Sequence, residues 1–443
     1  MAAAYHLCVE GGVQRLIVVD ERPPLSLTSD KSTEAYRNWW PGPDDAMIRL
    51  MNRSIDWLES WARADGNRIR LNRRGYVYAT AEAAGVARLW NSAEMASSQG
   101  AGPWRLHDGR PGALDYQPVS AESFDDQPAG ADLLLDPDLI RRHFPYLSPH
   151  VRALLHVRRC GWFSGQQLGM SLWEKARQRG AQLIQGRVTG VAIAGGRVSR
   201  VQVATSGGDI CLETPVFVNA AGPLLKPVGQ LLGVELPVFS ERHLKAAFND
   251  SLGIVPRDAP LLIWEDSQRL EWSAEEREWL ADSAETRPLA GSLPPGAHLR
   301  PEGGHGSQTL LLLWAYDAHP TPEHWPLPEN PYFPEVALRG AAAMIPGLRA
   351  YLTAMPRPYV DGGYYTKTAE NRLLAGPLPV DGAYVLGALS GFGLMAAPAA
   401  AELLAAHITG APLPDYASAF SLTRYTDPAY TARLAAWGAS GQL

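Results

Sequence analysis

The spacing of apolar and polar residues predicts regular elements near both ends of the chain. Apolar side chains recur every three to four positions across residues 44–65, which predicts an amphipathic helix ending at Gly66. Residues 384–386 form a short apolar run bounded by glycine, which favours a buried parallel strand. An alanine-rich helix is expected at residues 396–408, ending at Gly410. Residues 384–408 therefore predict a strand, a glycine turn and a helix in succession.

The rest of the chain divides into a part with helices and strands and a part dominated by strands. Residues 1–10 predict a helix, and residues 13–20 predict a β-branched strand. Strands within residues 182–205 are separated by a hairpin turn at Gly195-Gly196, which predicts a meander. Between residues 234 and 360, strand-like runs alternate with proline-rich loops and lack regular crossover helices, which favours a mixed or antiparallel sheet.

Two further segments carry expectations about exposure. Residues 74–80 predict a strand that alternates between a wet and a dry face. Residues 91–130 are rich in Gly, Ser, Pro and Asp, which is typical of an extended surface excursion.

Composition bounds the class of protein. The chain has 443 residues, 46% apolar and 19% charged, which is ordinary for a large globular enzyme with about two domains. Its net charge of −6 argues against a nucleic-acid partner, and it has no apolar stretch long enough for a membrane span. Cys8, Cys160 and Cys211 are far apart and fit neither a metal site nor a disulfide framework, so we expect no metal and a cytoplasmic location.

The glycine turn after the predicted strand is open to two interpretations. Glycines let a backbone approach a ligand closely, and the following helix would direct free N–H groups at it. The same glycines also serve simple packing of a helix on a strand. The neighbouring sequence favours the first interpretation. Lys-Thr-Ala-Glu-Asn-Arg at residues 367–372, the Gly-Ala-Leu-Ser-Gly-Phe-Gly turn at 387–393 and Thr423-Arg424 resemble the carboxy-terminal signature of the D-amino-acid-oxidase-like flavoproteins, which include sarcosine, glycine and dimethylglycine oxidising enzymes.

The resemblance implies an α/β fold with a Rossmann-like FAD-binding domain, a three-stranded meander and an α+β substrate domain built on a mixed or antiparallel sheet. By this resemblance, residues 1–73, 150–233 and 361–443 form the FAD-binding domain, and residues 74–149 and 234–360 form the substrate domain. The implied flavin-binding residues at the turn are Gly387, Ser390, Gly391, Phe392, Gly393, Leu394 and Met395. Those implied elsewhere are Glu21, Arg22, Thr28, Ser29, Lys31, Ser32, Thr33, Val188, Ala220, Ala221 and Gly222.

The beginning of the sequence departs from the family pattern. In relatives, a strand and a Gly-x-Gly-x-x-Gly loop precede the segment that corresponds to residues 2–7, and neither is present here. We expect either a start codon placed too far downstream or a chain without this phosphate-binding loop. The acidic residue Glu21, after the strand at 13–20, is expected to bind the ribose of the cofactor.

Four residues are candidates for substrate chemistry. By resemblance, Arg37 occupies the position of an arginine that binds the substrate carboxylate, a role that suits its planar guanidinium. Tyr365 belongs to an expected aromatic wall. His298 and Arg300 alternate onto one face of a predicted strand, so both are candidates for a pocket, although a hydrogen-bonded surface edge explains them as well. Where several relatives place a second basic residue for the carboxylate, this chain has Met395.

The resemblance implies an FAD-dependent oxidoreductase that oxidises a carbon–nitrogen bond of a small amine or N-methyl or other amino acid by hydride transfer. Relatives that bind flavin covalently use a histidine or a cysteine; the corresponding place here holds Gly363, so non-covalent FAD is expected. The alternatives are a flavoprotein that oxidises a C–OH bond, such as that of a 2-hydroxy acid, and a flavin-free relic or partner-binding subunit. The electron acceptor, whether oxygen or a carrier protein, is not specified by the sequence.

Overall fold

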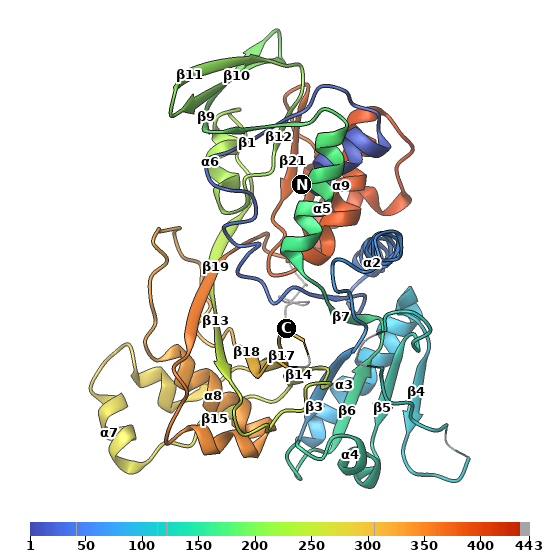
Figure 1. Ribbon diagram of the computed structural model, residues 1–443, viewed down its shortest axis with the longest axis vertical. Helices are drawn as coiled ribbons and strands as arrows, with labels where there is room; N and C mark the ends of the chain where they lie inside the picture. Colours follow the sequence, from blue (N-terminus) through green and yellow to red (C-terminus); the bar gives the residue numbers. More distant parts are fainter. Residues whose placement is uncertain (41, 113, 121–122, 305, 435–443) are drawn as a thin grey trace.

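A computed structural model describes residues 1–40, 42–112, 114–120, 123–304 and 306–434. Its largest element is a nine-stranded sheet in the order β19-β13-β18-β17-β14-β3-β6-β5-β4, which fills the lower half of Figure 1. The pairs β14–β3 and β4–β5 are parallel and the others are antiparallel, so the expected mixed sheet is confirmed. Its strands are β3 (Tyr76–Thr80), β4 (Trp104–His107), β5 (Ala131–Leu134), β6 (Ala153–Val157), β13 (Phe239–Asn249), β14 (Leu261–Trp264), β17 (His298–Pro301), β18 (Thr309–Leu313) and β19 (Tyr359–Lys367).

Smaller sheets make up the other half of the molecule. β1 (Ile17–Asp20) pairs in parallel with β8 (Gln182–Gln185). A separate sheet has the order β12-β21-β20, in which β21 (Ala383–Gly387) is parallel to β12 (Phe217–Asn219) and antiparallel to β20 (Leu374–Pro377). The predicted meander is formed by β9 (Arg187–Ala194), β10 (Arg197–Thr205) and β11 (Gly208–Glu213). The described strands are completed by two pairs, β2 (Ala35–Arg37) with β7 (Cys160–Trp162) and β15 (Gln268–Arg269) with β16 (Ser292–Leu293).

Helices cover these sheets, and Figure 1 shows α1, α5 and α9 grouped beside β21. The α-helices are α1 (Ala2–Tyr5), α2 (Ala46–Ala64), α3 (Ala83–Ala96), α4 (Pro137–His143), α5 (Gly165–Gln178), α6 (Leu225–Gln230), α7 (Ala274–Ala281), α8 (Phe333–Met344), α9 (Gly393–Thr409) and α10 (Pro428–Leu434). Two π-helical turns, η1 (His6–Glu10) and η2 (Ser97–Ala101), extend α1 and α3. None of the helices in the described ranges is long and apolar enough to cross a membrane.

The elements predicted from periodicity form close to their expected positions. The buried face of α2 carries the apolar stripe, including Leu50, Met51 and Leu58, and the Asp44 carboxylate accepts a hydrogen bond from the Ala46 amide at 3.1 Å near its start. α9 ends at Gly410, whose φ of 73° is the left-handed conformation that glycine adopts at little cost. Local sequence therefore fixes these helices.

One expectation about exposure and one about regularity are wrong. All five residues of β3 are buried, because Tyr76 and Tyr78 pack into the hydrophobic core on one face of the large sheet and Val77 and Ala79 into the core on the other. A strand in the middle of a sheet covered on both faces has no wet side. The segment 91–130 is also more regular than predicted, since it contains the end of α3, η2 and β4.

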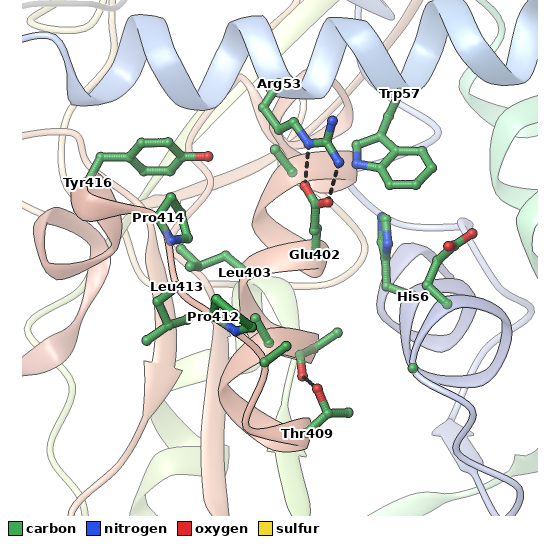
Figure 2. Close-up of a pocket in the computed structure, with 16 residues that line it drawn as sticks. His6, Arg53, Trp57, Glu402, Leu403, Thr409, Pro412, Leu413, Pro414 and Tyr416 are labelled. Atoms are coloured by element: carbon green, nitrogen blue, oxygen red, sulfur yellow. Dashed lines mark hydrogen bonds and ion pairs between the residues drawn. The ribbon is translucent and has the colours of Figure 1, made fainter.

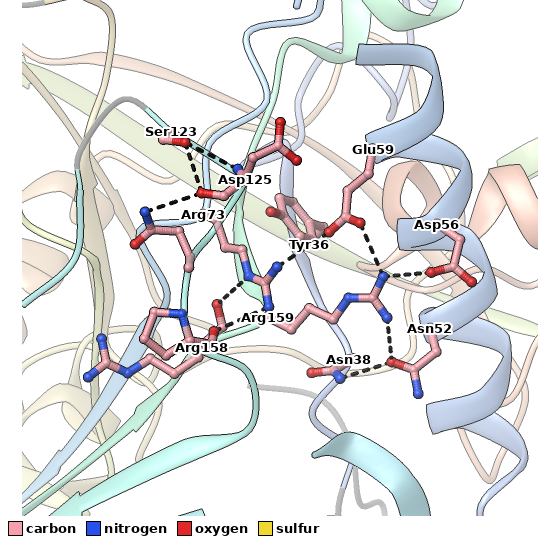
Figure 3. A network of polar contacts seen from close by, with 12 residues as sticks. Tyr36, Asn38, Asn52, Asp56, Glu59, Arg73, Ser123, Asp125, Arg158 and Arg159 are labelled. Carbon is pink, nitrogen blue, oxygen red and sulfur yellow. Dashed lines mark hydrogen bonds and ion pairs between the residues drawn. The ribbon is translucent and has the colours of Figure 1, made fainter. Parts of the chain in front are cut away.

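An ion network fastens the strand pair β2–β7 to α2 (Figure 3). Arg159 directly precedes β7 (Cys160–Trp162), and its guanidinium donates hydrogen bonds to Asp56 at 2.6 Å and Asn52 at 3.2 Å on α2. Glu59 on the same helix lies 3.6 Å from the Arg73 guanidinium and 3.4 Å from that of Arg159. Because β7 pairs with β2 (Ala35–Arg37), the network also holds β2 in place.

Candidate functional site

Residues distant in sequence meet around a cavity of about 70 Å³ between the large sheet and the amino end of α9. The predicted site residues that line it are Thr33, Arg37, His298, Tyr365, Gly391, Phe392 and Met395. The same cavity is lined by Trp40, Tyr76, His243 and Trp314, which were not among the predicted catalytic or cofactor-binding residues. The structure thus brings both ends and the middle of the chain into one place.

Arg37 enters this cavity from β2, where it pairs with Cys160 of β7. Only 6% of its surface is exposed. Its Nη1 donates a hydrogen bond to the Tyr78 hydroxyl at 3.3 Å, and its guanidinium lies 4.4 Å from the ring centre of Trp40. A cation held against an aromatic face in a buried site is well placed to bind an anionic ligand group.

Tyr365 and His243 form a stacked pair on the neighbouring strands β19 and β13. Their ring centres are 3.9 Å apart and their planes differ by 14°. Burial raises the pKa of Tyr365 to about 12, so its hydroxyl stays protonated. His243 Nε2 lies 3.2 Å from Glu241, which also accepts a hydrogen bond from Lys367 at 3.1 Å. The period-two alternation of β13 was the sequence signal that places Glu241 and His243 on one face.

His298 and Arg300 lie on β17 but have different surroundings. His298 lines the cavity, and its Nδ1 is 2.8 Å from the Gly296 carbonyl oxygen. Arg300 is 1% exposed, donates two hydrogen bonds to the Thr33 carbonyl at 3.0 and 2.6 Å, and stacks 4.9 Å from the Trp162 ring centre. Arg300 therefore fixes the backbone of the segment that carries Thr33, whereas His298 faces the cavity.

The turn at residues 388–393 approaches the cavity through close backbone packing. Ala388 and Ser390 have φ values of 54° and 48°, and the Ser390 amide donates to the Thr366 carbonyl at 2.9 Å. A Cβ on Gly391 would lie 2.5 Å from Tyr365 Cε2, so only glycine fits there. By contrast, a Cβ on Gly387 would meet the Leu225 side chain at 2.6 Å, which places Gly387 in the packing behind the turn.

The amino end of α9 has no side-chain cap. Phe392 is its N-cap residue, Gly393 and Leu394 open the helix, and Met395 in its first turn lines the cavity. The first N–H groups of a helix have no partner within the helix, and they carry a partial positive charge. Ser390 Oγ is buried and has no hydrogen-bond partner in the part of the chain that the structure describes. These groups form a set of unused donors at the edge of the cavity.

The segment 28–33 runs beside β19 at the rim of the same cavity. Thr28 Oγ1 donates to the Tyr364 carbonyl at 3.1 Å, and Lys31 forms ion pairs with Asp30 at 2.7 Å and Asp361 at 3.2 Å. Ser32 Oγ accepts a hydrogen bond from the Glu34 amide at 3.0 Å. Ser29, between them, is exposed. The predicted residues of this segment are thus held in one defined loop.

Most of the other predicted cofactor residues lie at the carboxyl ends of β1 and β12, and Val188 lies near the start of β9. Together with Asp20 we call this region the nucleotide edge (Asp20, Glu21, Arg22, Val188 and residues 220–222). Glu21 is exposed and forms an ion pair of 2.5 Å with Arg187, and the Arg22 amide donates to the Asp20 carboxylate at 3.0 Å. Val188 pairs with Val203 in the meander, and Gly222 follows β12 with a φ of 55°. Asp20, the last residue of β1, is a second acidic candidate for binding the ribose. Only its neighbour Glu21 was predicted for this role from the sequence.

A larger cavity of about 690 Å³ lies between η1, α2, α9 and residues 411–416 (Figure 2). Its charged groups Arg53 and Glu402 satisfy each other through two hydrogen bonds of 2.7 and 2.5 Å. None of the predicted site residues lines it. The smaller cavity is therefore the candidate functional site, since seven of the predicted site residues line it. No group of metal-ligating side chains is found in the described ranges.

Comparisons with known proteins place the chain in a family. The family model "FAD dependent oxidoreductase" matches residues 1–407. No curated protein sequence matches significantly. Among solved structures, L-proline dehydrogenase from P. horikoshii is similar with a TM-score of 0.71 and 18% identity over 96% of this chain and 94% of that one. Glycine oxidase from Geobacillus kaustophilus gives a TM-score of 0.70 and 15% identity over 96% and 95%.

Iminodiacetate oxidase from Chelativorans sp. BNC1 has the same fold, with a TM-score of 0.67 and 16% identity over 95% of each chain. At these identities the structural likeness establishes the fold, and the match of the family model over most of the sequence establishes the relationship. The chain belongs to the family of FAD-dependent oxidoreductases.

Proposed function

We propose that this protein uses FAD to oxidise the carbon–nitrogen bond of a small amine or amino acid. The observation that carries the proposal is the cavity in which Arg37, His298 and Tyr365 face the uncapped amino end of α9. The names of the similar structures support this substrate class, since they include a proline dehydrogenase, a glycine oxidase and an iminodiacetate oxidase.

The residues at the turn fit the ring system of FAD. The Ser390 hydroxyl has no hydrogen-bond partner among the described residues, and the first amides of α9 are free to donate to a carbonyl or an anionic ring. The close contact of Gly391 with Tyr365 leaves no room for a side chain at position 391. We assign Ser390, Gly391, Phe392 and Met395, together with residues 31–33, to the flavin ring.

The nucleotide edge offers residues for the ribose of FAD. Ligands of parallel α/β sheets bind at the carboxyl ends of the strands, where Asp20 and residues 220–222 lie. The sequence contains no Gly-x-Gly-x-x-Gly loop for the pyrophosphate. We therefore assign the ribose to Asp20 or Glu21 and derive no contact to the pyrophosphate.

We also propose that FAD is held without a covalent bond. No cysteine lines the cavity, and Gly363 stands where some relatives have one. A Cβ at Gly363 would lie 3.1 Å from Thr28 Cα, which leaves little room for a larger side chain there. The three cysteines are free thiols, two of them buried, which supports a reducing cytoplasmic location.

The protein's own contribution to the reaction is binding, orientation and exclusion of water. Arg37 would hold a substrate carboxylate through paired hydrogen bonds, so that the adjacent C–H bond points across the cavity. Trp40, Tyr76 and Phe392 provide apolar walls that keep water away from the reacting carbon. The chemistry that FAD supplies when bound is the acceptance of a hydride from that carbon, which leaves the substrate as an iminium ion.

The test is anaerobic reduction of the FAD-loaded protein by a panel of substrates. The panel contains primary amines, amino acids, N-methyl amino acids and 2-hydroxy acids, and loss of the oxidised flavin absorbance is the readout. The proposal expects reduction by amines or amino acids and none by 2-hydroxy acids. Reduction by 2-hydroxy acids alone, or protein that takes up no FAD on reconstitution, would contradict it. Acid precipitation then checks the linkage: non-covalent FAD stays in the supernatant.

A further inference from the structure

His298 occupies a fixed position at one wall of the cavity. It opens β17, where it pairs with Ile263 of β14 on one side and with Leu313 of β18 on the other. These strands lie inside the nine-stranded sheet, so the backbone at His298 cannot shift without breaking two ladders. The backbone position of His298 is therefore set by the sheet.

The hydrogen bond to Gly296 determines which ring nitrogen carries the proton. His298 Nδ1 lies 2.8 Å from the Gly296 carbonyl oxygen. A carbonyl oxygen can only accept, so Nδ1 is the protonated nitrogen and Nε2 holds a lone pair in the neutral ring. Nε2 makes no hydrogen bond to any of the described residues.

The surroundings keep the ring neutral. Burial lowers the pKa of His298 to about 4, and the positive charge of Arg37 and the nearby His243 act in the same direction, while the bond to Gly296 opposes them. The groups that face it are Arg37 from β2 and His243 from β13. Above about pH 5 the cavity therefore contains a neutral acceptor beside a permanent cation.

We propose that His298 Nε2 accepts a hydrogen bond from the N–H of the substrate amine, so that the enzyme selects amino acids that keep an N–H when neutral. Arg37 can only donate and His298 Nε2 can only accept, and both line one cavity. A ligand with a carboxylate at one end and an N–H at the other matches both groups. The inference rests on the proposed function and narrows its substrate class.

The inference separates secondary from tertiary amines. The amine must be unprotonated when hydride leaves the adjacent carbon, and a neutral secondary or primary amine then still has an N–H to donate. A neutral tertiary amine has none, and its extra methyl group would stand against Nε2. A buried acceptor left without its donor is costly, which predicts at least a tenfold preference for the N–H substrate.

The experiment compares N-methylglycine with N,N-dimethylglycine on the FAD-loaded protein. Rates of anaerobic flavin reduction and calorimetric dissociation constants are measured for wild type, His298→Asn and His298→Gln. Asparagine keeps a donor near the Nδ1 position but has nothing at Nε2, whereas glutamine places an amide there. Wild type should prefer N-methylglycine at least tenfold, His298→Asn should bring the two within about twofold, and His298→Gln should restore part of the preference.

The chain offers a matched control in His319, which is exposed and whose Nδ1 also lies 2.8 Å from a backbone carbonyl two residues earlier. His319→Asn should keep the wild-type ratio. A second measurement on unmutated protein uses ¹⁵N-labelled histidine. N-methylglycine should shift the Nε2 resonance of His298 in the direction of an accepted hydrogen bond, and an unmoved resonance overturns the inference.

The two proposals fail in different ways. An unchanged preference in His298→Asn, with normal flavin reduction, overturns the role of His298 and leaves the proposed function standing. Selective binding of N-methylglycine, without flavin reduction by any amine or amino acid of the panel, overturns the proposed function and supports the role of His298. Absence of binding by both ligands overturns the role of His298, and the panel then decides the proposed function by itself.

Discussion

The two ends of the expected cofactor site are built in different ways. The cavity around Arg37 and His298 rests on a continuous sheet of nine strands, and His298 itself has a paired strand on each side. The nucleotide edge rests on two separate pieces, β1–β8 and β12-β21-β20, which share no ladder. Helix packing holds this end together, since Ala4 and Cys8 near the amino terminus contact Trp173 and Ala176 of α5.

The difference teaches where rigidity comes from in this molecule. His243 and His298 lie on strands with both edges paired, β13 and β17, whereas Arg37 on β2 and Tyr365 on β19 lie on strands with one paired edge. At the nucleotide edge, β1, β8 and β12 each have an unpaired edge. Ile17 of β1 is 44% exposed and Leu183 of β8 is 38% exposed, while Leu299 next to His298 is fully buried. The cavity should therefore respond sharply to single substitutions, and the nucleotide edge should be the more dynamic part.

Hydrogen exchange should show the largest contrast. A strand paired on one side uses only alternate amides, so about half of the β1 amides lack a backbone partner, whereas both neighbours protect β17. We expect exchange in β1 to be faster than in β17 by on the order of 1000-fold. Mass spectrometry of peptides covering residues 13–20 and 297–301 measures this. Equal protection would show that the β1 edge is paired in solution.

Removal of the cation from the cavity should have the next largest effect. Arg37→Met keeps an unbranched apolar side chain but removes the guanidinium, and with it the carboxylate anchor and the contact with the Trp40 ring. We expect kcat/KM for an amino acid to fall about 100-fold, which corresponds to the loss of about 3 kcal/mol of binding to a charged group. Arg110→Met is the control, because the Arg110 side chain is 83% exposed. An unchanged value in Arg37→Met would exclude a carboxylate substrate.

A methyl group at the turn tests how tightly the cavity is packed. Gly391→Ala would bring a Cβ within 2.5 Å of Tyr365 Cε2, whereas Gly393→Ala meets its nearest neighbour, Leu389, at an ordinary 3.4 Å. We expect Gly391→Ala to destabilise the fold by about 1–3 kcal/mol and to weaken FAD binding. Gly393→Ala should cost much less. Denaturant titration and FAD titration of both variants provide the measurement, and equal effects would refute the packing argument.

The smallest effects are expected at the nucleotide edge. Glu21 already pairs with Arg187, so its carboxylate is partly neutralised before any ribose binds. The pKa of Glu21 is lowered by this hydrogen bond from Arg187. We expect Asp20→Ala to weaken FAD binding about tenfold and Glu21→Ala to weaken it less than twofold. Fluorescence titration with FAD distinguishes them, and the reverse order would restore Glu21 as the ribose ligand.

The sequence predicted several residues that the structure gathers around the cavity, because parts of this region are local in the chain. The turn at residues 387–393 and the helix after it follow from glycine and alanine content over a short stretch, and Arg37 follows from its place in a motif. His243 was missed because nothing within β13 distinguishes a strand residue that faces a ligand from one that faces the core. Arg300 was grouped with His298 by alternation, but its bonds to the Thr33 carbonyl come from a segment more than 260 positions away.

The sequence by itself determined the helices α2 and α9, the glycine turn and the family, since periodicity, capping and motif order act over neighbouring residues. Only the tertiary structure decided that β3 is buried on both faces and that Tyr365 stacks on His243. The physical reason is that strand pairing and burial depend on which distant segments meet, and no local pattern encodes the partner.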